Sequence, residues 1–497
     1  MANKLVGYEY PFKKYKKAWK NVLFNQFHDI LAGCSLESAY KDASYLYGES
    51  MSVAEQEINF ALQAISRKID TGAPSSEMYK ENKWYWENMH VGTPIVLFNH
   101  HPYEVTERVT LQFLADKITD ENGNEIVMQK AMPEYVDAGN IYLSSFIATV
   151  PAMGYKVYKA YTVDGFDGSL NEKQIEISEE GYLNNGVISV EFNKVNGEIS
   201  KITNVKTGEV LLDGECKALF LDETECDTWA HDKRDLGEVV GEFSNAEFSI
   251  VEQGAVFATL RVVTKFNDSV LIRDYTLDKG SDTLIVNGEI LTYEKHKTFK
   301  LSFPANNTIK ASIPFGTVER PINDGEYPFQ KWFAVNKIAV LNDCRYGYDG
   351  TDDSVRMTVF RTAVYADHYG KRRPVMRYME QGSTRFKYAI CPYTNSLDAY
   401  NRANAFLTPI RIVSESFHNG NLPTQFSAVK GDVNVVFSAV KQGENGKGAV
   451  VRYYEVNGEK INKNVEFYGK KISVNVNPFE IKTIDENGKE YDFTEME

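Results

Sequence analysis

The stretch EFNKVNGEISKI, residues 191–202, carries the pattern that decides the fold of most of this chain. Two runs of alternating apolar and polar residues flank the dipeptide Asn196-Gly197. Alternation with a period of two is typical of a strand with one buried face, and Asn-Gly is the strongest short signal for the turn of a β-hairpin. The stretch therefore predicts two antiparallel strands joined by a turn.

The same pattern extends over most of the sequence. Asn-Gly occurs eight times, from Asn122 to Asn487, and never in the first 120 residues. Several of these dipeptides lie between further strand-like runs, such as YYEVNGEKI and TIDENGKEY. From about residue 94 to the end we therefore expect antiparallel sheets built as sandwiches.

The first seventy residues predict helices instead. Between residues 15 and 31, apolar side chains recur at steps of three or four, the spacing of one helical face: Trp19, Leu23, Phe27 and Ile30. Gly33 is a natural helix stop, and Ser35 is a plausible N-cap for the next helix. An apolar stripe continues over residues 36–69, roughly 50 Å of helix at 1.5 Å per residue. Two such helices form a hairpin whose stripe needs a further surface to cover it.

The predicted fold class is therefore mainly β, with an N-terminal α-helical hairpin or bundle followed by antiparallel β-sandwich domains, one of them a super-sandwich. A chain of 497 residues is too long for one core. Changes in composition place boundaries in TGAPSSEMYKEN (71–82), SEEGYLNNG (178–186) and SFHNGNLPTQ (416–425). The predicted units are a helical segment (1–80), a small β-sandwich (90–175), a large β super-sandwich (176–420) and a C-terminal β-sandwich (421–497).

Composition excludes several classes of partner. The net charge of −14 argues against nucleic acid, because a surface that binds phosphates is normally basic. No apolar run is long enough to span a bilayer, and the first thirty residues lack the pattern of a signal peptide. The five cysteines are scattered without a C-x-x-C pair, which favours reduced thiols. We expect a cytoplasmic protein without nucleic-acid or membrane partners.

The first candidate for chemistry is the pair His28-Asp29 in the stretch NVLFNQFHDILAGCS. A neutral His is a common zinc ligand, and a neighbouring Asp can bind sugar hydroxyls or orient the imidazole. Adjacent helical residues point about 100° apart, so the pair does not act as two ligands from one face. The alternative is a His that hydrogen-bonds within the bundle beside a solvated Asp. One His cannot hold a catalytic zinc, which needs three protein ligands.

Two further stretches carry polar groups in loops. LDETECDTWAHD, residues 221–232, surrounds Trp229 with acids that include Asp227, and carboxylates beside an indole are typical of a sugar site. The alternative is an acidic surface loop with one packed Trp. VLNDCRYGYDG, residues 340–350, contains Arg345, which can donate to a substrate oxygen. The alternative there is a hairpin connection with an exposed Arg.

Taken together, these stretches resemble glycoside hydrolase family 38, the class II α-mannosidases. AWKNVLFNQFHDILAGCSLESAYKDA is similar to the family pattern Asn-Gln-Phe-His-Asp-Ile-Leu-Pro-Gly-Ser, with Ala32 and Cys34 in place of Pro and Ser. The resemblance continues in order to the end of the chain. It includes the motifs PIVLFNHHPYEVTERV, VPAMGYKVY, GEISKITNVKTGEVL, DTWAHD, PFGTVERP, FQKWFAV, LNDCRYGYD and MEQGSTRFKYAICP.

The resemblance implies a zinc-dependent retaining α-mannosidase that acts on mannose-containing oligosaccharides through a glycosyl-enzyme intermediate. In this family a catalytic barrel precedes the helical bundle and carries an H-x-D zinc pair, the nucleophile and the acid/base carboxylate. No H-x-D occurs in this sequence, so we expect the 497 residues to be the C-terminal part and inactive alone. His28 would be the one zinc ligand here. Asp29, Arg345, Asp227 and Trp229 would contact substrate, and no catalytic residue is expected.

Two alternative functions remain open at the level of sequence. The sandwiches of a carbohydrate-binding module would hold glycans without cleaving them, and Trp229 would be the natural contact. In a structural role, the chain would support the barrel and form a homo-oligomer. The strands show no row of exposed aromatics, because Tyr and Phe at alternating positions are more simply core residues. The structural role therefore ranks above glycan binding for the chain by itself.

Overall fold

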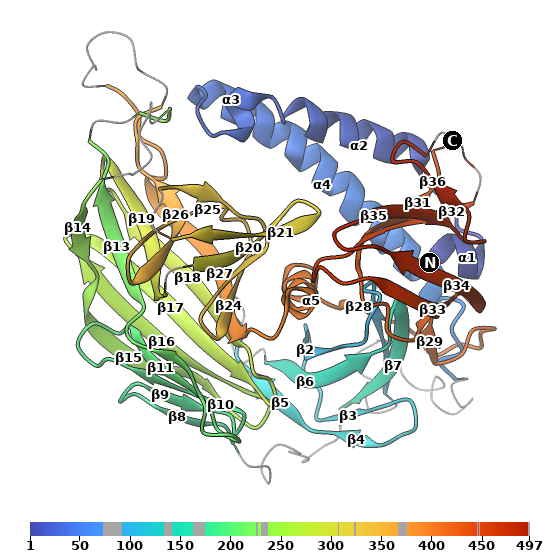
Figure 1. Cartoon of the computed structure of the whole chain (residues 1–497). Helices are drawn as coiled ribbons and strands as arrows, with labels where there is room; N and C mark the ends of the chain where they lie inside the picture. Colours follow the sequence, from blue (N-terminus) through green and yellow to red (C-terminus); the bar gives the residue numbers. More distant parts are fainter. Residues whose placement is uncertain are drawn as a thin grey trace.

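The structure is a computed structural model of the chain. It describes residues 1–72, 92–133, 142–162, 174–224, 227–229, 237–306, 308–322, 325–365, 375–444, 446 and 448–495. Most of the predicted linker at 71–82 lies outside the described residues. The predicted fold class is confirmed, because antiparallel sheets form most of the described chain and the helices are concentrated at its N-terminus (Figure 1).

The N-terminal helices form a hairpin. The described helices are α1 (Ala2–Val6), α2 (Phe12–Phe24), α3 (His28–Leu31), α4 (Glu37–Ser66) and, between later strands, α5 (Ser396–Leu407). Figure 1 shows α2 lying along α4, with the single turn α3 in the connection between them. None of the helices in the described part of the chain is long and apolar enough to cross a membrane.

The prediction of one continuous helix over residues 15–31 is wrong. The Asn25 side-chain amide donates to the carbonyl of Asn21 (3.0 Å), and Asn25 is the C-cap residue directly after α2. Phe27 then has extended backbone (φ −56°, ψ 139°), so His28 begins a separate turn. Ser35 is not an N-cap, because its N–H donates to the Tyr40 hydroxyl (2.8 Å) and α4 begins after Leu36.

Polar contacts join α2 to α4. Ser50 Oγ donates to the Ala18 carbonyl (3.0 Å), and Lys17 of α2 pairs with Glu49 of α4. Five large apolar side chains between residues 19 and 31 are 58 to 74% exposed. We call this set the outer apolar face: Trp19, Leu23, Phe24, Phe27 and Leu31. The predicted stripe is therefore present, and no described residue of the chain buries it.

A small sandwich follows the hairpin. One sheet has the order β28 (Arg411–Ser414), β1 (Thr93–Asn99), β7 (Gly154–Tyr161), β3 (Lys117–Thr119) and β4 (Glu125–Ile126), with β29 (Gln425–Ser427) also on β7. The other has the order β2 (Val105–Leu111), β6 (Leu143–Val150) and β5 (Met128–Ala131). The base of the hairpin packs on the first sheet, where Ile65 and Ile69 are buried with Tyr155 and Val157.

The large sandwich contains three described sheets. The first is β12 (Val210–Asp213), β11 (Ile199–Asn204), β10 (Ile188–Phe192), β9 (Tyr182–Asn184) and β8 (Glu176–Ser178). The second is β14 (Val239–Glu242), β13 (Lys217–Asp222), β19 (Lys297–Pro304), β26 (Ser354–Arg361), β25 (Gly347–Thr351) and β22 (Tyr327–Pro328). The third is β15 (Ser244–Gln253), β16 (Phe257–Phe266), β17 (Ser269–Asp278), β18 (Leu284–Thr292), β27 (Gly382–Pro392), β24 (Ile338–Asn342), β23 (Trp332–Val335), β20 (Thr308–Ile313) and β21 (Gly316–Pro321).

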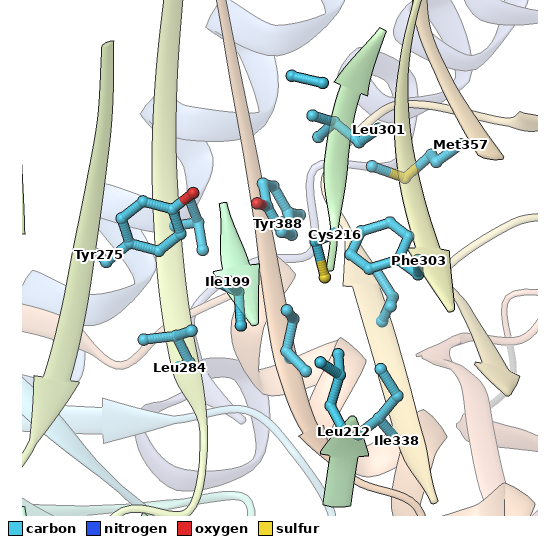
Figure 2. Packing of buried hydrophobic residues seen from close by; sticks show 14 of the residues in the cluster. Ile199, Leu212, Cys216, Tyr275, Leu284, Leu301, Phe303, Ile338, Met357 and Tyr388 are labelled. Carbon is cyan, nitrogen blue, oxygen red and sulfur yellow. The ribbon is translucent and has the colours of Figure 1, made fainter. Parts of the chain in front are cut away.

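One continuous core joins these three sheets. Figure 2 shows Ile199 of β11, Tyr275 of β17, Phe303 of β19 and Tyr388 of β27 converging on Cys216. Such a core forms because each strand contributes alternate apolar residues to the same interior. The pattern that predicted strands also selected these core positions.

The hairpin predicted in residues 191–202 is confirmed. Strands β10 and β11 pair antiparallel, and residues 193–198 connect them. Gly197 has φ +71°, and a Cβ there would lie 2.5 Å from a methyl group of Val262, so glycine is required. The dipeptide Asn287-Gly288 is an exception, because it lies inside β18. There the Phe386 ring occupies the space of a side chain at Gly288.

The C-terminal sandwich completes the chain. Its sheets are β30 (Val429–Lys430), β33 (Ile461–Phe467) and β34 (Lys470–Val476), and β31 (Val436–Gln442), β32 (Ala449–Tyr454), β35 (Ile481–Asp485) and β36 (Glu490–Tyr491). Before reaching it, the chain returns to the small sandwich, where β28 pairs with β1 and β29 with β7. The predicted domain limits remain predictions, and they take no account of this return.

Candidate functional site

The pair His28-Asp29 lies at the tip of the hairpin, the end nearest the large sandwich (Figure 1). The His28 side chain is 75% exposed, and its Nε2 lies 3.5 Å from Asp29 Oδ1. The Phe27 and His28 rings lie against one another with centroids 4.2 Å apart. The imidazole and the carboxylate therefore lie at the surface, available to groups outside the described chain.

A second predicted stretch meets this tip. The Trp229 indole N–H donates to the Cys34 carbonyl (2.7 Å), although the two residues are 195 positions apart. The Cys34 N–H in turn donates to the Asp29 carbonyl (3.2 Å). Burial raises the pKa of the Cys34 thiol, and the nearby Asp29 and Asp227 carboxylates raise this pKa further. Asp29, Asp227 and Trp229 are thus gathered around Cys34.

Arg361, at the end of β26, organises the loop that carries Trp229. Its guanidinium donates to the carbonyls of Asp227 (3.0 Å) and Thr228 (3.1 Å). The same guanidinium pairs with the buried carboxylate of Glu223. The Asp227 carboxylate accepts a hydrogen bond from the backbone N–H of Trp229 (2.8 Å), which closes a local turn. Arg361 therefore fixes the backbone from which the indole extends.

Two more contacts join the tip to the large sandwich. Arg377 donates to the Glu37 carboxylate of α4 (2.7 Å). The rings of Tyr40 and Tyr365 lie with centroids 6.0 Å apart. These contacts surround the connection between α3 and α4. The large sandwich therefore touches the tip through side chains from three separate segments of the chain.

Arg345 lies apart from these contacts. Its guanidinium donates to the Arg385 carbonyl on β27 (2.8 Å), and its N–H donates to Asn342 Oδ1 (2.6 Å). The surrounding stretch is not a hairpin, because β24 belongs to one sheet and β25 to another. The structure therefore gives Arg345 a role within the large sandwich. Of the acidic stretch 221–232, the residues Glu225, His231 and Asp232 lie outside the described residues.

The described chain does not form a complete metal centre. No group of three His, Cys, Asp or Glu side chains placed to hold a metal ion occurs among the described residues. The exposed His28 imidazole can still supply one ligand, because its ring nitrogens are the kind of donor that zinc prefers. One imidazole would supply at most one of the three protein ligands that a catalytic zinc needs.

Two known family profiles match parts of this sequence. Residues 183–369 match the profile of the glycosyl hydrolases family 38 C-terminal domain, and residues 1–65 match the alpha mannosidase middle domain. The chain belongs to glycoside hydrolase family 38. The second match contains His28 and Asp29, and the first contains Asp227, Trp229 and Arg361. The contact at the hairpin tip therefore joins the two family 38 domains to each other.

Two curated relatives of the chain are named as alpha-mannosidases. It is 21% identical over 415 residues to alpha-mannosidase 2C1 of Mus musculus, covering 78% of this chain and 34% of the relative. It is 22% identical over 425 residues to alpha-mannosidase G of Dictyostelium discoideum, covering 77% and 37%. The chain thus spans about a third of the length of these curated relatives.

A solved family 38 fold matches almost the whole chain. The alpha-mannosidase from Enterococcus faecalis V583 superposes with a TM-score of 0.79 at 17% sequence identity. The match covers 97% of this chain and 64% of that one. At this identity the match establishes the fold, and it includes the hairpin together with the sandwiches.

Some residues at the tip could not be predicted from the sequence. Arg361 lies in an ordinary strand-like run, and its partner Glu223 is 138 positions away. Glu37 and Arg377 are 340 positions apart. Only the density of acids around Trp229 marked one side of this contact. The pairing partners became visible when the fold brought the segments together.

Proposed function

We propose that these residues form the C-terminal part of a zinc-dependent retaining α-mannosidase that hydrolyses terminal α-mannosidic bonds of oligosaccharides. The observation that carries the proposal is the exposed His28-Asp29 pair at the hairpin tip of a family 38 fold. An imidazole and a carboxylate exposed together at a fixed tip are suited to bind a metal and sugar hydroxyls.

The chain's own residues have separate roles in this proposal. His28 donates an imidazole nitrogen as a zinc ligand, and Asp29 accepts hydrogen bonds from hydroxyls of the mannose. When bound, zinc supplies Lewis-acid and template chemistry for those hydroxyls. Trp229 remains 45% exposed while its N–H is engaged with Cys34, so its ring face lies at the rim of the same site.

The catalytic groups and the other zinc ligands would come from a family 38 barrel. The outer apolar face supports this view, because five large apolar side chains exposed within residues 19–31 are more than the scattered apolar residues of an ordinary surface. We propose that the barrel covers this face and places its zinc ligands and carboxylates opposite His28. The 497 residues alone would then bind no catalytic zinc and hydrolyse no mannoside. The free thiols of Cys34 and Cys344 support a reducing, cytoplasmic location.

The test compares the chain alone with the same chain joined to a family 38 barrel domain, using an aryl α-mannoside and zinc. We expect hydrolysis only by the joined protein. In that protein, His28→Ala should lower kcat/KM at least roughly 100-fold and release zinc, measured by metal analysis. Lys463→Ala, an exposed change on β33 of the C-terminal sandwich, is the control and should retain both. Robust turnover by the chain alone would overturn the proposal.

A purely structural function is the second candidate, because the outer apolar face also suits a second copy of the chain. In that case the mass measured by sedimentation would double with concentration, and Leu23→Ser would abolish the dimer. Our proposal instead expects a monomer once the barrel is present. Glycan binding by the chain alone, lost in Trp229→Ala, would favour a binding module.

A further inference from the structure

The turn that carries His28 and Asp29 has little to hold it by itself. Helix α3 has four residues, no side-chain cap and no buried residue. A single helical turn is unstable in isolation, because one turn gains too few hydrogen bonds to offset the ordering of its backbone. Its orientation must therefore be set by contacts with other parts of the protein.

The contact with Trp229 meets that need. The indole N–H reaches the Cys34 carbonyl at 2.7 Å, and the Cys34 N–H donates to Asp29 at 3.2 Å. Two hydrogen bonds thus connect the indole to the backbone of α3. An indole nitrogen is a donor only, and the rigid ring has few rotamers, so it fixes its acceptor in one direction.

The base of the Trp229 loop is itself held firmly. Arg361 donates to two consecutive carbonyls, Asp227 and Thr228, and its charge is paired with Glu223. Glu223 also accepts the Thr298 hydroxyl (2.9 Å) in the interior of the large sandwich. A rigid path therefore leads from the sandwich to the hairpin tip.

We propose that Trp229 is a positioning residue, which fixes α3 through the Cys34 carbonyl so that His28 and Asp29 keep one orientation toward the zinc and mannose site. This inference rests on the proposed function for the role of His28 and Asp29. It also assigns Trp229 to the support of the site, in addition to any contact of its ring with sugar.

The first arm of the test uses the 497-residue chain and needs no activity. Trp229→Phe keeps an aromatic ring and removes the N–H. We expect amide hydrogen exchange in residues 28–36 to become roughly 3- to 10-fold faster, the effect of losing one hydrogen bond. The global unfolding midpoint should not change. Tyr293→Phe, which removes an exposed hydroxyl on the large sandwich, is the control and should exchange as the native chain does.

The second arm uses the chain joined to a family 38 barrel. Trp229→Phe should weaken zinc binding roughly 10-fold and lower kcat/KM without lowering the thermal midpoint. Trp229→Ala should weaken zinc binding no more than slightly further, because the N–H is already absent in the Phe variant. Native exchange in Trp229→Phe, or native zinc affinity beside a defective His28→Ala, would overturn the positioning role.

A different result would separate this inference from the proposed function. If His28→Ala also leaves zinc affinity unchanged, the proposed function fails, and the positioning role toward the site fails with it. The exchange data would then still report whether Trp229 holds α3, because they do not depend on zinc or on substrate.

Discussion

The interior of the large sandwich and the N-terminal hairpin differ in which side chains they bury. In the sandwich even a charged residue is buried: Arg273 on β17 is 1% exposed, and its partner Glu198 is equally enclosed. In the hairpin the aromatic residues Trp19 and Phe24 face outward. The described apolar side chains of the sandwich interior are buried by the chain itself, whereas those of the outer apolar face of the hairpin remain exposed.

The largest expected loss of stability follows the removal of the buried Arg273. Arg273 donates to Glu198 through two nitrogens (2.7 and 3.0 Å), and Glu198 also accepts the Ala218 N–H. Arg273→Ala leaves a buried carboxylate without its cation, so we expect the free energy of unfolding to fall by roughly 3–5 kcal/mol. Urea denaturation measures this loss.

The neighbouring strand offers the control. Arg261 on β16 makes an equally good two-nitrogen contact with Asp274 (2.7 Å each), but on the solvent side of the same sheet. Arg261→Ala should cost no more than about 1 kcal/mol, because an exposed ion pair is weakened by hydration. Equal losses in the two variants would mean that burial does not decide the importance of an ion pair here.

The next largest loss of stability is expected at the base of the hairpin, and the outer apolar face provides the comparison. Ile65 is buried against Tyr155 of the small sandwich, whereas Leu23 is exposed. Ile65→Ala should lower the free energy of unfolding of the hairpin by roughly 3 kcal/mol, the usual cost of a cavity in a core. Leu23→Ala should change it by at most about 0.5 kcal/mol in the chain alone. Limited proteolysis between α2 and α4 distinguishes the two outcomes.

A large effect of Leu23→Ala in the isolated chain would contradict this picture, because it would require the outer apolar face to be packed within the chain. In the protein joined to a barrel, the same substitution should become costly. The comparison between the two proteins therefore also tests whether the barrel covers this face.

The sequence predicted what depends on local pattern. Alternation around Asn196-Gly197 predicted a true hairpin, because a pleated strand with one buried face requires that period. The resemblance also identified His28-Asp29 as the candidate pair. The sequence did not predict the break at Phe27, because the apolar spacing continues across it while the Asn25 side chain competes for the helix carbonyl of Asn21.

The sequence also could not predict contacts that only the fold creates. The contact of Trp229 with sugar stays a prediction, but the hydrogen bond from its indole N–H to the Cys34 carbonyl was not predicted. Asn287-Gly288 had the composition of a turn, yet it lies inside a strand because the Phe386 ring needs the space above Gly288. In each case the deciding neighbour is about a hundred or more residues away, where no window of sequence can show it.

The junction between the small and the large sandwich is neither as buried as the sandwich interior nor as exposed as the outer apolar face. There Glu107 of β2 borders a cavity of about 500 Å³ that is also lined by Asp278, Arg402 and Phe406. Its carboxylate accepts the Ile410 N–H (2.6 Å). Burial raises the pKa of Glu107 to about 7, and the Ile410 N–H and the Lys387 ammonium offset only part of this rise.

This half-buried carboxyl predicts a pH dependence of stability. Because the pKa is higher in the folded state than in the unfolded chain, the folded state binds more protons between about pH 4.5 and 7. The free energy of unfolding should therefore fall as the pH rises through that window. Glu107→Gln keeps the acceptor for Ile410 and removes the charge, so it should be more stable than the native chain by roughly 2 kcal/mol at pH 8 and equal at pH 4.

Denaturant unfolding of the native chain and of Glu107→Gln at several pH values measures the difference between their free energies of unfolding. The titration of all other groups cancels in this difference. Glu104→Gln, an exposed change three residues earlier, should follow the native chain at every pH. If Glu107→Gln also follows the native chain, water reaches this carboxylate freely, and the junction belongs with the hairpin surface. If the difference appears as expected, the junction behaves as an interior, in contrast to the exposed outer apolar face of the hairpin.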